Sequence, residues 1–256
     1  MDKKGFLKKV SFLDNNVVSS IYDKIILAQK INKVICTGEF YTPQVWKTIE
    51  SLSEDIGINV YSYGVFEDAE RRIIAFSNDN VLYYPVNLIK VKGKSKFNNL
   101  KHKDYLGAIM ALGIKREKFG DLILSNDECY AAVHEEIVQY IKMNLTSIGK
   151  SKCTVDVLNI CDCRIPKYDF QESVVNVSSL RIDCVVSTLC NIARGKAEEL
   201  IRQGKVLVDY SDDFRKNKIL KFSSIITIRG YGKFKIVEEI GWTNSGKVKI
   251  LVKKFI

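Results

Sequence analysis

The sequence predicts an α+β chain of several domains, and three observations lead to this fold class. The chain has 256 residues, whereas single domains usually contain about 100–200. Apolar residues recur at helical spacing in some segments and alternate, as in half-buried strands, in others. Hydrophobic content of 46% and charged content of 27% are those of an ordinary folded protein.

A small α/β domain is expected over residues 1–75. Apolar positions form a helical stripe from Val17 to Ile31, and a second helical stretch runs from Pro43 to Ile56, followed by a terminating Gly57. Short apolar runs at 34–36 and 58–63 predict strands. The domain carries ten basic and ten acidic residues, and nothing in it specifies a partner.

Residues 76–165 predict the order strand, helix, strand, strand, helix, strand. The strands are expected at 85–91, 121–125, 128–133 and 152–160, and the helices at 104–112 and 134–145. This order indicates a four-stranded antiparallel sheet with two helices on one face, an RRM-like (ferredoxin-like) architecture. RNA-recognition domains of this kind stack bases on aromatic side chains of the central strands. Here those strands offer little beyond Tyr130, so base stacking on this sheet is not expected.

A lysine-rich segment separates the first strand of this domain from its first helix. Its six lysines, with no acidic residue before Asp104, are Lys90, Lys92, Lys94, Lys96, Lys101 and Lys103. Such a run is typical of a solvated loop that aids solubility. It also suits a loop that follows an RNA backbone, because lysines contact phosphates as point charges without sequence preference. Both interpretations stay open, and the six lysines are a second set of candidate RNA contacts.

No motif in the chain predicts catalysis, a metal or a cofactor. The seven cysteines form no CxxC pair, so we expect buried thiols in a reducing cytoplasm. No glycine-rich loop precedes a suitably spaced acid, and only two histidines are present. Asp121, after Gly120, is the best isolated carboxylate, and we expect it to cap a turn. We predict neither catalytic residues nor metal ligands.

The net charge of +10 is concentrated in the last third of the chain. Residues 176–256 hold 16 basic and 8 acidic side chains, whereas residues 76–175 hold 14 and 12. A cationic domain favours an anionic partner, either nucleic acid or a membrane surface. No stretch approaches the ~20 apolar residues that span a bilayer, and no apolar run of signal-peptide length follows the basic N-terminus. Nucleic acid is therefore the expected partner.

Residues 166–178 are interpreted as a linker, and residues 179–256 as the basic C-terminal domain. A helix is predicted from Leu180 to Ile192 with Ser179 as its N-cap, and a second from Lys196 to Gln203. Strands follow at 205–209 and 225–230. The cations that this arrangement offers to RNA phosphates lie at an inter-helix corner and around a glycine turn: Arg181, Arg194, Lys196, Lys205, Arg229 and Lys233.

The segment SLRIDCVVSTLCNIARGKAEELIRQGKVLVDY, residues 179–210, resembles the S4 RNA-binding domain, also called the αL motif. The matching positions are Arg181-Ile-Asp183, Arg194, Ala197, Leu200-Ile201 and Gly204-Lys-Val206-Leu-Val208. Four positions depart from the pattern: Ala193 replaces a serine, Asp209 an asparagine, and Ser223-Ser224 a Gly-Asp pair. These changes weaken capping and turn chemistry but keep the cations.

The resemblance extends over almost the whole chain. HKDYLGAIMALGIKREKFGDLIL at 102–124, FEDAERRIIAF at 66–76 and RGYGKF at 229–234 are similar to segments of the YlmH-like family of S4-domain RNA-binding proteins. The resemblance implies a cytoplasmic bacterial protein that binds rRNA, and also tRNA, on the ribosomal large subunit. It further implies a role in translation or in the rescue of stalled ribosomes, that is, ribosome quality control. We expect a monomer.

Two other function classes stay open. S4 domains also accompany pseudouridine synthases and RNA methyltransferases, so an RNA-modifying enzyme is one alternative. A scaffold associated with cell division is the other, since the neutral first domain could bind a protein.

Overall fold

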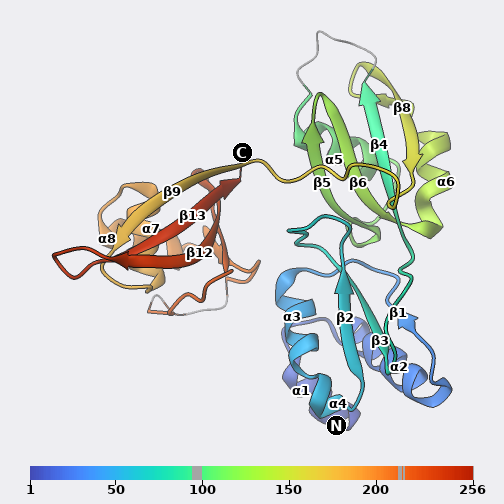
Figure 1. Ribbon diagram of the computed structural model, residues 1–256, viewed down its shortest axis with the longest axis horizontal. Coiled ribbons are helices and arrows are strands. Elements are labelled where there is room, and N and C mark those ends of the chain that lie inside the picture. The colour runs from blue at the N-terminus through green and yellow to red at the C-terminus, as the bar shows by residue number, and fades with distance from the viewer. Residues whose placement is uncertain (94–99, 213–214, 216, 256) are drawn as a thin grey trace. The chain divides into compact units, whose positions relative to one another are not determined.

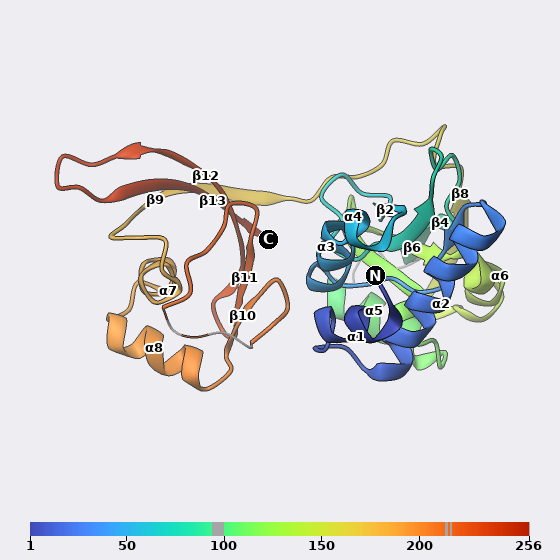
Figure 2. The ribbon, with the colours of Figure 1, turned by 90° about the horizontal axis from the view of Figure 1, so that it is seen from below.

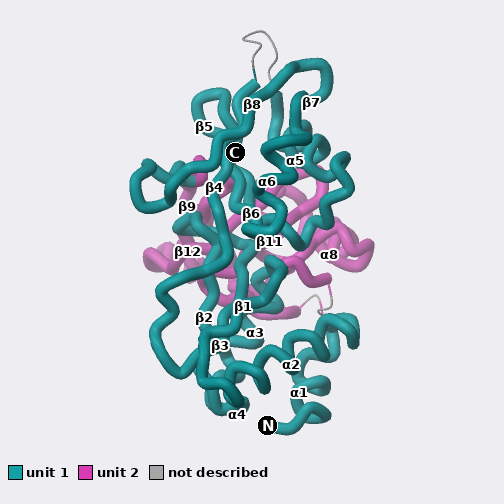
Figure 3. The backbone as a smooth tube through the Cα atoms, turned by 90° about the vertical axis from the view of Figure 1, so that its right-hand side faces the viewer, with its two compact units in different colours: residues 1–167 teal, residues 168–256 magenta. Residues whose placement is uncertain are grey.

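The computed structural model describes residues 1–93, 100–212, 215 and 217–255 (Figure 1). The chain divides into two compact units, residues 1–167 and residues 168–256 (Figure 3). Helices and three separate sheets occur along the described chain. The predicted α+β multidomain class is therefore confirmed.

The first unit begins with a three-stranded antiparallel sheet of order β1-β3-β2 and its helices. These elements are α1 (Lys3–Lys9), α2 (Asn15–Ile31), β1 (Ile35–Cys36), α3 (Pro43–Ser51), α4 (Ser53–Ile56), β2 (Asn59–Tyr63) and β3 (Ile73–Ser77). Helix α2 starts where the Asp14 side chain accepts the N–H of Asn16 at 2.8 Å. Ile21 and Ile25 of this helix share one buried core with Trp46.

The same unit continues with a five-stranded antiparallel sheet of order β5-β6-β4-β8-β7. Its elements are β4 (Val86–Gly93), α5 (His102–Ala111), a 3-10 turn (Arg116–Lys118), β5 (Phe119–Ser125), β6 (Glu128–His134), α6 (Glu135–Asn144), β7 (Ser147–Ile148) and β8 (Ser151–Leu158). Ile109 of α5 and Ile141 of α6 belong to one core with Ile89 and Val91 of β4, so both helices cover the same face. The structure has the predicted element order and adds the short strand β7.

Hydrogen bonds donated by main-chain N–H groups join the two sheets of the first unit. The Asp121 carboxylate accepts the N–H groups of Glu70 at 2.5 Å and Arg71 at 3.2 Å. The Phe40 N–H donates to the carbonyl of Glu117 at 2.7 Å. A Cβ at position 120 would lie 2.8 Å from the Phe40 ring, which explains the glycine. Asp121 thus binds a distant loop rather than capping a turn of its own.

The second unit is a five-stranded antiparallel sheet of order β10-β11-β12-β13-β9 with two helices (Figure 2). Its elements are β9 (Phe170–Val177), α7 (Ile182–Cys190), α8 (Arg194–Arg202), β10 (Val206–Val208), β11 (Ile225–Ile228), β12 (Gly232–Trp242) and β13 (Val248–Phe255). Val185 and Ala197 of the helices are buried with Ile226 and Ile250 of the sheet.

The structure corrects two predictions in this unit. Residues 170–177 are not linker but strand β9, which pairs with the whole length of β13. Val175 and Val177 pack into the core, whereas Val174 and Asn176 between them are exposed. Helix α7 begins two residues later than predicted, with Arg181 rather than Ser179 at its N-cap. The Ser179 hydroxyl instead accepts the N–H of Arg181 at 3.4 Å, because Ser179 lies two residues before the N-cap.

Candidate nucleic-acid interface

Arg181 and Arg194 meet on the carboxylate of Asp183. Arg181 precedes α7, Asp183 lies in its first turn, and Arg194 begins α8. Nε and Nη2 of Arg181 donate to Oδ1 and Oδ2 of Asp183 at 3.2 and 3.0 Å. Nε and Nη2 of Arg194 both donate to Oδ2, at 2.8 and 2.6 Å. We call these three residues the arginine triad; it fixes two guanidinium groups at the corner between the helices.

Asp183 is fully buried and remains ionised within the triad. Burial alone would raise the pKa of its carboxyl group, but hydrogen bonds and positive charge from both arginines outweigh burial and lower the pKa. The carboxylate also accepts the N–H of Cys184 at 3.0 Å, at the helix end where an anion is favoured. One negative charge therefore serves two cations, which leaves the triad with a net charge of +1.

Both guanidinium groups keep hydrogen-bonding capacity towards solvent. An arginine has five N–H donors, and the contacts to Asp183 account for two on each side chain. The Arg181 side chain is 38% exposed and that of Arg194 is 51% exposed. Planar guanidinium groups bind phosphate bidentately, and holding them in place reduces the entropy lost on binding. The triad is therefore suited to contact an RNA backbone.

The other predicted cations are distributed over the second unit. Lys196 is exposed in the first turn of α8, two residues after Arg194, whereas Lys205 follows the far end of this nine-residue helix. The N–H of Arg229 donates to the carbonyl of Lys205 at 2.8 Å, so these two residues are neighbours. The Lys233 amino group donates to the Tyr210 hydroxyl at 3.0 Å and lies over the Phe255 ring. Their contact with RNA stays a prediction.

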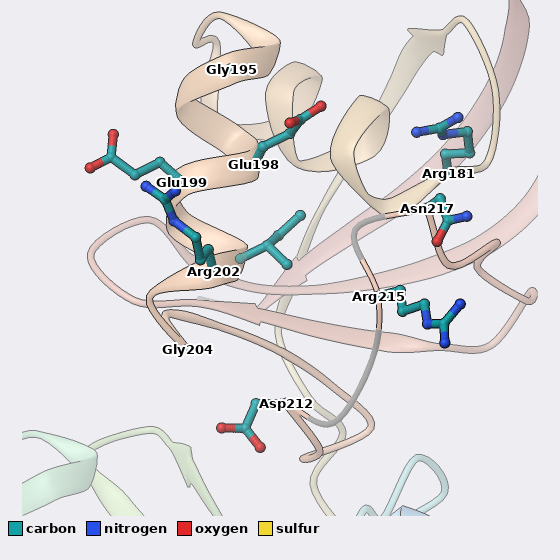
Figure 4. A pocket seen from close by; sticks show the side chains of 10 residues that line it. Arg181, Gly195, Glu198, Glu199, Arg202, Gly204, Asp212, Arg215 and Asn217 are labelled. Atoms are coloured by element: carbon teal, nitrogen blue, oxygen red, sulfur yellow. The ribbon is translucent and has the colours of Figure 1, made fainter.

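A cleft of about 920 Å³ adjoins the triad within the second unit. Figure 4 shows Glu199 and Arg202 of α8 on one side, with Arg181 and Arg215 across from them. Its described lining residues are Arg181, Gly195, Glu198, Glu199, Ile201, Arg202, Gly204, Asp212, Arg215 and Asn217. Among these described lining residues, three arginines, one of them Arg181 of the triad, are matched by three acidic residues.

Two lysines of the lysine-rich segment pair with one acid. Lys90 and Lys92 of β4 lie 3.8 and 3.2 Å from the Glu128 carboxylate. Burial works to raise the pKa of Glu128, but the Tyr130 hydroxyl and the two lysines lower it overall. Lys101 and Lys103 are exposed at the start of α5. Lys94 and Lys96 lie outside the described residues.

The described residues show neither a cluster of metal ligands nor a membrane-spanning helix. Among them, no three His, Cys, Asp or Glu side chains gather as metal ligands would. No helix in this part of the chain is long and apolar enough to cross a membrane. Burial raises the pKa of the Cys36 and Cys190 thiols to about 11, so both are protonated at neutral pH.

Sequence reasoning identified both arginines of the triad but gave Asp183 no role. The available signal was the Arg181-x-Asp183 spacing at a helix start, where a carboxylate in the first turn can reach back to the preceding residue. Arg202, Arg215 and Trp242 were also not singled out, because an isolated charged or aromatic residue carries no periodic signal.

Comparison with known proteins places the chain among related sequences. The family model described as "Putative RNA-binding domain in YlmH" matches residues 81–162, which contain strands β4 to β8. Ribosome-associated protein quality control protein P2 of Bacillus subtilis (strain 168) is 25% identical over 220 residues, covering 84% of this chain and 86% of that protein. A solved structure, the cell division protein ylmH from Streptococcus pneumoniae, matches with a TM-score of 0.47 and 18% identity, over 59% of this chain and 95% of that one.

Proposed function

We propose that this chain, which is a YlmH-like protein, binds RNA on the ribosome and acts in ribosome-associated quality control. The name of the Bacillus subtilis relative and the description of the matching family model support this role. The proposed mode of action is binding without catalysis.

The observation that carries the proposal is the arginine triad. Two partly exposed guanidinium groups are fixed on one buried carboxylate in the unit that holds most of the chain's excess positive charge. RNA binding would release counterions from the phosphates, and the fixed spacing of the guanidinium groups would favour one backbone shape over others. Arg181 and Arg194 are therefore the first RNA contacts in this proposal, followed by Lys196, Lys205, Arg229 and Lys233.

The finer assignment follows the S4 resemblance. We infer that the second unit is an S4 domain, that its target is structured rRNA of the large subunit, and that tRNA held there is a further contact. In this view residues 76–165 form the RRM-like part, with the described lysines of the lysine-rich segment as a weaker contact. This role belongs in the cytoplasm, and we expect the chain to act as a monomer.

Cosedimentation with purified ribosomal large subunits tests the proposal. Replacing both arginines, Arg181→Ala with Arg194→Ala, should weaken binding by about 100-fold, because each lost charge-assisted contact contributes about 1.5 kcal/mol. The slope of log affinity against log salt should become shallower by about one to two units. Lys8→Ala with Lys9→Ala removes the same charge from exposed positions of α1 and serves as the matched control.

Unchanged sedimentation of the double arginine variant would contradict the proposal. Since this variant leaves Asp183 buried without its cations, its folding must be checked by circular dichroism. The pair Arg181→Lys with Arg194→Lys keeps the charge and provides an independent test of the same contacts.

A further inference from the structure

The hairpin of β12 and β13 ends in an ordered turn. The N–H of Thr243 donates to the Lys247 carbonyl at 2.8 Å, and the N–H of Lys247 donates to the Thr243 hydroxyl at 2.9 Å. Gly246 adopts φ +76° and donates its N–H to the Thr243 carbonyl at 2.9 Å. Figures 1 and 2 show this tip extending beyond α7 and α8 of the same unit. The hairpin therefore holds its end residues in a fixed arrangement.

This tip exposes two large apolar side chains. Trp242 is 60% exposed and Ile240 is 47% exposed, whereas Val248, the cross-strand partner of Trp242, is buried. The chain has two tryptophans, and the other, Trp46, is buried and donates its indole N–H to the Glu70 carbonyl. The register of the hairpin shifts between Glu239 and Gly241, and such irregularities often redirect a side chain next to a functional site.

Two lysines lie beside the turn. Residues 240–249 contain Lys247 and Lys249 and no acidic residue, and the exposed Glu238 and Glu239 precede them on β12. The tip also lies at the same end of the sheet as the arginine triad, because Trp242 pairs with Val248 and Val248 pairs with Val177, four residues before Arg181. Adjacent strands are about 4.8 Å apart, so the backbones of Trp242 and Val177 are about 10 Å apart. The strand pairing therefore brings the tip close to the chain segment that leads into the triad.

We propose that Trp242 is a stacking platform for an unpaired RNA base, with Lys247 and Lys249 beside it to contact the adjoining backbone. The proposal rests on the proposed RNA-binding function and adds a second contact to it. Aromatic side chains stack on every base type, which gives affinity for single-stranded segments without sequence preference. The triad would then bind the shaped backbone, and the hairpin would select targets that have an unpaired nucleotide nearby.

Tryptophan fluorescence tests this assignment directly. In the full chain carrying Trp46→Phe, Trp242 is the one remaining tryptophan. Titration with an oligouridylate of about twelve nucleotides should quench its emission by more than half, while a blunt RNA duplex should quench it little. Trp242→Ala should weaken oligouridylate binding about tenfold and Trp242→Phe about threefold, since phenylalanine keeps a smaller stacking face. Phe12→Ala, at a comparably exposed apolar residue of the first unit, is the matched control.

Because Trp46→Phe removes a buried hydrogen bond, the wild-type chain and Trp242→Phe provide a second comparison: quenching should occur in the first and be lost in the second. If the protein sediments with large subunits but Trp242 emission is unchanged and Trp242→Ala binds oligouridylate normally, the inference is overturned while the proposed function stands. If Trp242→Ala weakens binding to large subunits but leaves oligouridylate binding unchanged, the hairpin contacts a ribosomal protein. The base-stacking assignment is then likewise overturned. Absence of any binding to large subunits or RNA would overturn the proposed function itself.

Discussion

Two regions of the molecule each place a pair of cations on a single carboxylate, with different results. In the arginine triad of the second unit, four hydrogen bonds of 2.6–3.2 Å join Arg181 and Arg194 to Asp183, which is fully buried. On β4 and β6 of the first unit, Lys90 and Lys92 lie 3.8 and 3.2 Å from Glu128, which is partly exposed. Both groups have a net charge of +1.

The difference lies in geometry rather than charge. A guanidinium group that donates two hydrogen bonds to one carboxylate has a fixed orientation, so its remaining N–H groups point in defined directions. An ammonium group is a compact, hydrated charge on a flexible stem, so its position defines no single orientation of its N–H groups. We therefore expect the triad to recognise a particular RNA shape and the lysine pair to add affinity without preference. The residues matched by the family model contain the lysine pair, not the triad.

The largest expected difference follows from neutralising each carboxylate. Asp183→Asn removes the buried anchor of four hydrogen bonds and should lower the free energy of unfolding by about 1–3 kcal/mol, whereas Glu128→Gln should lower it by less than about 1 kcal/mol. Large-subunit affinity of Asp183→Asn should fall about tenfold, although the protein gains positive charge. Urea denaturation and cosedimentation measure the two effects.

Oligouridylate binding provides the control for Asp183→Asn. If Asp183 positions the arginines, this variant should bind oligouridylate at least as well as wild type, because its net charge is more positive while only shape recognition is lost. Tighter binding to both oligouridylate and large subunits would show that charge alone matters and would remove the distinction between the two regions.

Exchanging arginine and lysine at constant charge gives the next largest effect. Arg194→Lys should weaken large-subunit binding by about 1 kcal/mol, because lysine cannot reproduce the bidentate contact. Lys92→Arg should change it less than twofold. Equal effects of the two exchanges, measured by filter binding at a fixed salt concentration, would argue against oriented guanidinium groups as the basis of recognition.

The stabilising effect of Asp183 should also depend on pH. Folding lowers the pKa of Asp183 below its ordinary value of 3.8, so its stabilising effect is complete above about pH 4 and disappears as the pH falls through the lower folded-state pKa. The stability difference between wild type and Asp183→Asn should therefore be constant from pH 7 to 5 and shrink below about pH 4. A difference that persists unchanged at pH 2 would indicate that Asp183 acts by packing rather than by charge.

The smallest effect concerns turns in the two regions. Asn126 and Asp127, which join β5 to β6, have φ of 52° and 60°, and these residue types tolerate the left-handed region. Ser223, before β11, has φ 65° and stands where the S4 pattern has glycine. Ser223→Gly should raise the free energy of unfolding by about 0.5–1 kcal/mol, while Asn126→Gly should change it little. Thermal unfolding of both variants measures these changes in stability. A Ser223→Gly protein less stable than wild type would mean that the serine makes a compensating contact.

The elements were predictable where one hydrophobic period dominates. Strand β4 and helices α5 and α6 follow their apolar spacing closely, and Gly230 and Gly232 marked the turn between β11 and β12. Strand β9 was missed because only Val175 and Val177 face the core, and polar residues and Pro166 around them are typical of a linker. Contacts such as Asp121 with Glu70 join residues 51 positions apart, and spacing along the sequence contains no information about them. For the same reason, the arginines of the triad were found and their shared contact was not.

Crosslinking of the protein to purified large subunits, with identification of the crosslinked peptides by mass spectrometry, tests the central claim most directly. The account predicts that nucleotides are attached mainly to peptides from residues 179–205, around the arginine triad, and that Asp183→Asn reduces this signal. Crosslinks confined to residues 81–162, with none around the triad, would contradict it.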